Sequence, residues 1–148
     1  MSDRRLRLAA FVLTLAGIGV AAYLTYIHYA GLQPFCAGGS HGCERVQSSS
    51  YASVGGLPVA LLGLAGYVAI AVALVAPGER ARLAATALAV SGFGFSAYLT
   101  YLELFVIDAI CQWCVASAVI LTLLTVVTVW RLLVDDDPIA YARDGVEQ

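Results

Sequence analysis

Four long stretches of this chain contain no Asp, Glu, Lys or Arg, and they restrict its fold more than any other feature. These stretches cover residues 8–43, 46–78, 83–102 and 109–130. A membrane core of roughly 30 Å needs about 20 helical residues, because a helix rises about 1.5 Å per residue. Each stretch is long enough for one such helix. Only 12% of the 148 residues are charged, against roughly 25% in soluble domains.

We therefore predict an all-α membrane protein, a bundle of four transmembrane helices. The predicted spans are Leu8–Tyr29, Leu57–Ala76, Leu83–Phe105 and Trp113–Leu133. A β-barrel would instead show alternating segments of about 10 residues, and the sequence has none. We expect residues 1–134 to form one domain, followed by a short tail over 135–148. A net charge of -2 without any Lys excludes an ordinary nucleic-acid-binding protein.

The arginines predict how the bundle is oriented, since positive charge beside span ends marks the cytoplasmic side. Seven of the eight lie on the side that holds both termini: Arg4, Arg5, Arg7, Arg80, Arg82, Arg131 and Arg143. We expect both termini in the cytoplasm, and the long loop 30–56 and the connection 108–112 outside. The first apolar run is longer than the roughly 7–15 residues of a signal peptide, so we expect it to be retained.

The chain also repeats itself at an offset of 75 residues. This offset places Gly17–Tyr26 on Gly92–Tyr101 and Cys36 on Cys111. A parallel repeat of a two-helix unit is a common way to build a site between related halves of a membrane protein. Small residues and tyrosines in the repeat also suit helix packing and an aromatic belt. Each half is thus predicted to bring one cysteine to the outer face.

The four cysteines lie in the loops or at the outer ends of the spans: Cys36, Cys43, Cys111 and Cys114. An even number in an oxidising compartment suggests pairing. The first two flank a segment with three glycines, which predicts a flexible loop. Structural disulfides, a four-cysteine metal site and a thiol–disulfide relay all remain open, although the six-residue spacing of the first pair is poor for zinc.

The second pair forms Cys111-Gln-Trp-Cys114, where the fourth span begins. A helix N-terminus presents unpaired N–H groups and the positive end of the helix dipole, which favour thiolate over thiol. Trp113 is placed where a flat, lipid-soluble substrate could stack. This arrangement favours the relay over a purely structural role.

These motifs resemble the vitamin K epoxide reductase family in its bacterial form, over about residues 10–130. The segments that carry the resemblance are Cys36, Cys43–Ser49, Gly56–Gly63, Tyr98–Tyr101 and Cys111–Cys114. It implies a four-helix bundle around a quinone of the ubiquinone or menaquinone class, in the bacterial cytoplasmic (inner) membrane. It also implies that Cys114 works against the quinone and that Cys36 and Cys43 collect electrons from a partner. Cys43 would form the transient bond to Cys111.

The resemblance also implies a partner and further site residues. Because no thioredoxin-like domain follows the fourth span, we expect a separate, extracytoplasmic thioredoxin-like (DsbA-like) protein as the thiol donor. Candidates for the quinone pocket are Trp113, Ser48, Ser49 and Val59. The vertebrate enzyme has a Tyr where this chain has Ala118, and an Asn near the Pro58–Ala60 run, so plain quinone reduction is expected rather than epoxide recognition.

Quinone reduction consumes two protons, which directs attention to acids near the outer end of the bundle. Glu103 and Asp108 are candidate donors, because carboxylates at such depth are costly. No metal is expected. The rival hypotheses are a membrane adaptor stapled by disulfides and a metal-binding protein. A different four-span thiol oxidase family is disfavoured, because its Cys-x-x-Cys lies in the first outward loop.

Overall fold

The computed structural model describes residues 3–39 and 41–135, and it is dominated by four long helices. These are α1 (Asp3–Ala30), α3 (Val59–Val75), α4 (Glu79–Leu102) and α5 (Gln112–Asp135). The loop after α1 contains the 3-10 turn η1 (Ala37–Gly39), the short helix α2 (Gly42–Gln47) and the 3-10 turn η2 (Ser50–Ala52). A two-residue antiparallel pair, β1 (Ser53–Val54) and β2 (Leu57–Pro58), leads into α3.

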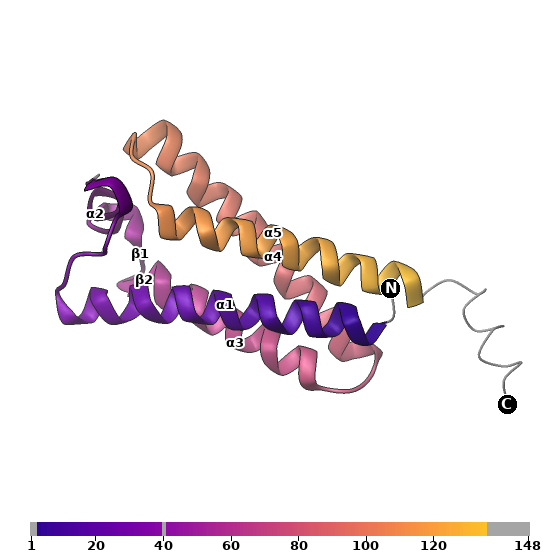
Figure 1. The fold of residues 1–148 in the computed structure, drawn as a ribbon. Helices are drawn as coiled ribbons and strands as arrows, with labels where there is room; N and C mark the ends of the chain where they lie inside the picture. Colours follow the sequence, from indigo (N-terminus) through magenta and orange to yellow (C-terminus); the bar gives the residue numbers. More distant parts are fainter. Residues whose placement is uncertain (1–2, 40, 136–148) are drawn as a thin grey trace, which may run out of the picture.

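The four long helices form a closed ring in which each helix packs against two others. α1 contacts α3 and α5, and α4 contacts the same two helices. Successive helices run in opposite directions, and α2 with the β1–β2 pair caps the end of the bundle away from the N-terminus (Figure 1). The interior contains small and aliphatic side chains, among them Ala10, Ile70, Ala89 and Leu124. The predicted all-α bundle is therefore present.

The first glycine of each copy of the sequence repeat lies at a helix contact. A Cβ on Gly17 would overlap the ring of Tyr67 on α3, and a Cβ on Gly92 would press against Leu121 on α5. Both positions allow a neighbouring helix to approach closely, as small residues do between membrane helices. The two repeat-equivalent glycines thus serve the same packing purpose in the two halves.

Within the described ranges, three helices are long and apolar enough to cross a membrane: Asp3–Ala30, Glu79–Ile107 and Gln112–Val134. The second predicted span is shorter than expected, because the chain at Leu57–Pro58 is extended and the helix begins at Val59. Proline fixes its φ and has no N–H to donate, which suits the cap position that Pro58 occupies. The 17 residues of α3 extend about 25 Å at about 1.5 Å per residue.

α4 does not end in a simple cap. Its last turn widens into a π-helical turn, η3 (Glu103–Ile107), and Asp108 then takes a left-handed conformation with φ 53°. π-Turns within helices are rare and are frequent at functional sites. Here the turn ends α4 and redirects the chain towards Cys111, where α5 begins.

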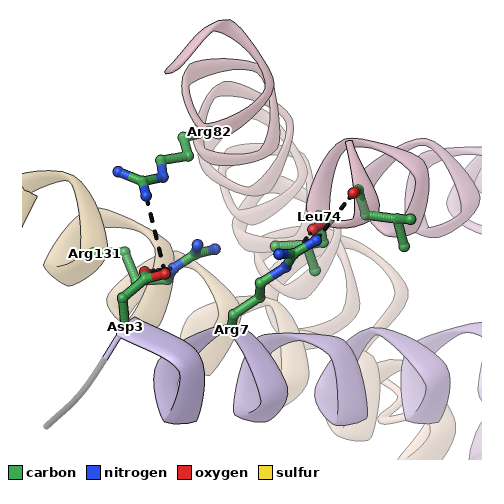
Figure 2. A network of polar contacts seen from close by, with 6 residues as sticks. Asp3, Arg7, Leu74, Arg82 and Arg131 are labelled. Atoms are coloured by element: carbon green, nitrogen blue, oxygen red, sulfur yellow. Dashed lines mark hydrogen bonds and ion pairs between the residues drawn. The ribbon is translucent and has the colours of Figure 1, made fainter. Parts of the chain in front are cut away.

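Polar contacts join all four helices at the end of the bundle that holds the N-terminus. Figure 2 shows Asp3 between Arg131 of α5 and Arg82 of α4, at 2.8 Å and 3.9 Å. Arg7 donates to the carbonyls of Leu74 and Val75, at 2.8 and 2.9 Å. Those carbonyls belong to the last turn of α3, where the helix offers them no N–H partner. The network fixes this end of the bundle.

We expect Arg131→Met to destabilise the bundle, because the Arg131 side chain is only 7% exposed and forms the shorter contact with Asp3. Removing one partner of a fully buried ion pair costs roughly 3–5 kcal/mol, and the partial exposure of Asp3 should reduce this to about 1–2 kcal/mol. Thermal unfolding in detergent, followed by circular dichroism, measures the effect. Arg80→Met, at an exposed arginine of the same end, is the control, and an equal loss in both variants would contradict the network's role.

Candidate functional site

All four cysteines gather in one apolar cluster at the end of the bundle opposite the N-terminus. Cys43, Val46 and Cys111 are its buried members, and Cys36, Trp113 and Cys114 pack against them. Cys43 and Cys111 are both 0% exposed. Cys36 and Cys43 form a disulfide, whereas Cys111 and Cys114 are free thiols. The two pairs are therefore neighbours and stand in opposite redox states.

A glycine brings the loop pair onto the second pair. Gly42 begins α2, and a Cβ at this position would overlap the carbonyl oxygen of Ile110. Without a side chain there, α2 can lie against the segment that precedes Cys111. Cys43 and Val46 lie three residues apart and share the buried face of α2. The loop helix is thus docked through the face that contains Cys43.

The Cys-x-x-Cys motif starts α5, as predicted. Cys111 precedes the first residue of α5, and its carbonyl accepts the N–H of Val115 at 3.0 Å. A hydrogen bond from the Cys114 thiol is the main cause that lowers the pKa of Cys111 from 9.0 to about 7, and the backbone N–H groups of Cys114 and Trp113 contribute. Cys111 is therefore the member of the pair that carries the thiolate near neutral pH.

The two residues between these cysteines hold the loop that carries Cys36. The Trp113 indole N–H donates to the carbonyl of Phe35 at 2.7 Å, and the Gln112 amide donates to the same oxygen at 3.2 Å. The Gln112 side-chain oxygen accepts the N–H of Ala37 at 2.9 Å. Ala37 and Gln112 are equivalent in the 75-residue repeat. The residues that follow the two equivalent cysteines therefore bond to each other.

Trp113 and Tyr23 lie together beside this loop. Their ring centroids are 4.8 Å apart, and the Tyr23 hydroxyl accepts the N–H of Phe35 at 3.2 Å. Both backbone polar groups of Phe35, its N–H and its carbonyl, are thus bonded by side chains from α1 and α5. This arrangement fixes the position of Cys36, the next residue.

A cavity of about 200 Å³ lies directly below the cysteine cluster. All four long helices and the loop contribute to its wall, which is mainly apolar. Leu24, Val59, Leu88 and Leu121 represent the four helices, and Val46 represents the loop. Cys114 opens onto the cavity, whereas Cys43 and Cys111 are not among its lining residues. A cavity of about 150 Å³ can hold benzene, so one substituted ring fits here.

The predicted pocket and proton residues divide into two groups. Ser49, Val59 and Glu103 line the cavity, whereas Ser48, Trp113 and Asp108 do not. Glu103 is 5% exposed and accepts the N–H of Cys111 at 3.1 Å. Asp108 is exposed, and Ser48 is exposed beside Arg45. The structure thus joins Glu103 to the cysteine pair and places Asp108 at the surface.

Among the polar side chains of the cavity wall that were not predicted from the sequence, Gln47, Tyr67 and Ser117 bond to one another or to Cys114. Gln47 contacts the Cys114 sulfur at 3.8 Å, and the Tyr67 hydroxyl bonds the Ser117 hydroxyl at 2.8 Å. The spacing of two of them could have been recognised in the sequence. Ser117 lies one helical turn after Cys114, and Gln47 lies one turn after Cys43 on α2. No local sequence pattern marks Tyr67, which reaches Ser117 across 50 positions of the chain.

The described ranges, 3–39 and 41–135, contain no cluster of three or more His, Cys, Asp or Glu side chains able to hold a metal ion. His41 instead lies 3.4 Å from Glu44 on the exposed surface of the loop.

The low pKa of Cys111 predicts a pH-dependent thiolate. In protein with reduced Cys111 and Cys114, the ultraviolet absorbance of the thiolate should rise with a midpoint near pH 7, with thiol below it and thiolate above. Cys114→Ala removes the hydrogen bond that chiefly stabilises the thiolate, so the midpoint should move up towards 9.0, the ordinary value. Cys111→Ala should lack the transition. An unchanged midpoint in Cys114→Ala would refute this pairing of the two thiols.

Comparison with known protein families identifies the chain. The model described as the vitamin K epoxide reductase family matches residues 8–129. This match covers the four long helices almost completely and all four cysteines. Membership indicates a membrane thiol–disulfide oxidoreductase, in agreement with the clustered cysteine pairs and the long apolar helices. The resemblance predicted from the motifs is confirmed: the chain belongs to the vitamin K epoxide reductase family.

Proposed function

We propose that this protein passes electrons from a thioredoxin-like partner through Cys36/Cys43 and then Cys111/Cys114 to a membrane quinone. The observation that carries the proposal is the position of Cys114, which packs against the buried cluster of Cys43, Val46 and Cys111 and also lines the cavity. In this account the four long helices span a bacterial cytoplasmic membrane, with the cysteine end outside. The reaction would support disulfide formation in exported proteins.

Exchange between the two cysteine pairs follows from their contact. Starting from an oxidised Cys111–Cys114 pair and a reduced loop pair, the Cys43 thiolate attacks the Cys111 sulfur and releases the Cys114 thiolate. The Cys36 thiolate then attacks Cys43, forms the Cys36–Cys43 disulfide and releases the Cys111 thiolate. The described structure has the bonding of this product. The lowered pKa of Cys111 makes it a good leaving thiolate in the second step.

The quinone step oxidises the second pair again. The Cys111 and Cys114 dithiol becomes a disulfide and gives up two electrons and two protons, and the quinone takes up both to become a hydroquinone. Cys114 is the thiol that lines the cavity, so it is the sulfur that meets the ring. A cavity of about 200 Å³ suits the quinone head group, and its isoprenoid tail would extend between the helices into lipid.

Glu103 is the better candidate of the two for handling protons. It is buried, it lines the cavity and it accepts the N–H of Cys111. A carboxyl group in this position can take the proton that a cysteine loses and release it to the quinone oxygen. Asp108, which is exposed, would act only through water.

The partner would act on Cys36, the less buried member of the loop disulfide. A thiolate of the partner attacks the Cys36 sulfur and forms a mixed disulfide with it, and Cys43 leaves as a thiolate. A second partner thiol then displaces Cys36. The hydrogen bonds that Gln112 and Trp113 donate to the Phe35 carbonyl would hold Cys36 in place during this exchange. A separate extracytoplasmic, DsbA-like protein fits this step.

The test is steady-state reduction of water-soluble ubiquinone and menaquinone analogues by purified protein in detergent, with excess small dithiol as the electron source. We expect many turnovers per protein molecule and none after the reduced protein has been alkylated. The relative rates rank the two quinone classes. Dithiol-driven quinone loss that is equal with and without the protein would refute the proposed function.

A further inference from the structure

A pair of hydroxyl groups lies one helical turn below Cys114. Ser117 follows Cys114 by three residues on α5, which places it about 4.5 Å further along the helix, at about 1.5 Å per residue. Its hydroxyl bonds the Tyr67 hydroxyl of α3 at 2.8 Å, and both residues line the cavity. Cys114, Ser117 and Leu121, spaced by three and four residues, form one face of α5 in the cavity wall.

Tyr67 is held in this place by its surroundings. It is 2% exposed, and its ring occupies the space that the missing side chain of Gly17 leaves on α1. Contacts with α1 and α5 thus fix the ring, and the rotation of the hydroxyl hydrogen remains free. Tyr67 and its partner Ser117 thus lie in the cavity wall together with apolar residues such as Ile70 and Leu121.

The hydrogen bonds between Tyr67 and Ser117 need only one of the two hydroxyl hydrogens. The Tyr67 O–H donates to the Ser117 carbonyl over a long 3.3 Å distance, and that carbonyl lies within α5, where a helical N–H also bonds it. The Ser117 O–H can donate to the Tyr67 oxygen at 2.8 Å. The Tyr67 hydrogen can therefore turn to a ligand without leaving a buried polar group unpaired.

We propose that Tyr67, oriented by Ser117, donates a hydrogen bond to the quinone carbonyl that lies across the ring from Cys114. The inference rests on the proposed function and adds a residue that selects among quinones. The two carbonyls of a para-quinone lie on opposite sides of its ring, so one can meet Cys114 and Glu103 while the other reaches Tyr67. An ortho-quinone has adjacent carbonyls and cannot do both.

The anchor, meaning the Tyr67 hydroxyl oriented by Ser117, differs from the polar groups that the resemblance implies for the vertebrate enzyme. Those groups fall on Ala118 and near Pro58–Ala60, where this chain offers no hydrogen-bonding side chain. Ala118 is moreover absent from the cavity wall, whereas its neighbour Ser117 is present. The hydroxyl pair thus offers a polar contact from a different part of α3 and α5.

The test compares a para-naphthoquinone with the ortho-naphthoquinone, which has the same ring system. In Tyr67→Phe, the ratio of the para KM to the ortho KM should rise about fivefold, the size expected for one neutral hydrogen bond. Ser117→Ala should raise the ratio less, because it disturbs only the orientation of the Tyr67 hydroxyl. Tyr26→Phe, at an exposed tyrosine outside the cavity wall, is the matched control and should leave the ratio unchanged.

Each outcome has a distinct meaning. A wild-type protein that reduces neither quinone contradicts the proposed function itself. Active protein in which Tyr67→Phe changes both KM values by the same factor overturns the anchor and assigns the Tyr67–Ser117 bond to helix packing. A rise confined to the ratio supports it, and equal thermal midpoints of the variants exclude misfolding as the cause.

Discussion

Cys114→Ala should reduce quinone turnover to the uncatalysed background, a loss of about three orders of magnitude or more, as expected when a nucleophile is removed. The physical reason is that Cys114 alone among the four cysteines lines the cavity. Without it, Cys111 cannot close a disulfide within the pair, and no two-electron donor faces the quinone. The measurement is the steady-state rate with excess small dithiol and a soluble quinone analogue.

The control for this variant is Val115→Ala. Val115 follows Cys114, is 42% exposed and lies outside the cavity wall, so its truncation tests whether a nearby change on α5 is enough to stop turnover. We expect Val115→Ala to retain most of the wild-type rate. Substantial quinone turnover by Cys114→Ala, above the protein-free rate, would remove Cys114 from the proposed role.

Protein with the double change Cys36→Ala and Cys114→Ala should form a Cys43–Cys111 disulfide almost completely. These two sulfurs belong to residues that are both 0% exposed and lie in one apolar cluster, and neither resolving thiol remains to open the bond. Mild oxidation followed by mass spectrometry of digested protein measures the yield. This outcome would settle the order within the loop pair, which sequence reasoning inferred only from the family resemblance.

The matched control keeps the other loop cysteine. Protein with Cys43→Ala and Cys114→Ala retains Cys36 and Cys111. Hydrogen bonds to the Phe35 carbonyl hold the Cys36 segment against Gln112 and Trp113. We expect only a minor yield of the Cys36–Cys111 disulfide there. Equal yields in the two double variants would show that the loop exchanges its cysteines freely and that the docking of α2 does not select Cys43.

Much of the helical architecture could be predicted because a bilayer imposes a simple rule on sequence. Runs without charge predicted all four long helices, and the fourth run placed the second cysteine pair where α5 begins. For the second run, the predicted start of the helix at Leu57 was wrong, because α3 begins at Val59. Pro58 and the β1–β2 pair interrupt an apolar stretch whose composition alone suggests helix. Hydropathy records that a residue is apolar and not which backbone conformation it adopts.

The site was less predictable, since its contacts join residues far apart in sequence. Sequence reasoning named both Glu103 and Asp108 as candidate proton donors, and the π-turn buries Glu103 beside Cys111 while Asp108 faces outward. From the sequence, Trp113 suggested a stacking surface for the substrate. In the structure its ring packs against Tyr23, and its indole N–H donates to the Phe35 carbonyl. Such outcomes depend on helix rotation, which periodicity does not determine.

The disulfide pattern bears on the rival hypothesis of a stapled adaptor. That hypothesis needs both cysteine pairs closed, whereas the structure joins Cys36 to Cys43 and leaves Cys111 and Cys114 as thiols. Cys114 also lines the cavity. A pair whose first member has a pKa near 7 is poised for exchange rather than for permanent bonding. Family membership points the same way.

The most direct test of the central claim is a single turnover. Fully reduced protein is mixed by stopped flow with a small excess of soluble quinone analogue, quinone absorbance is followed, and the protein is then quenched with a thiol-alkylating reagent. We expect rapid loss of quinone coupled to a Cys111–Cys114 disulfide, with one quinone reduced for each disulfide formed. Rapid formation of that disulfide without matching loss of quinone, or no reaction at all, would contradict it.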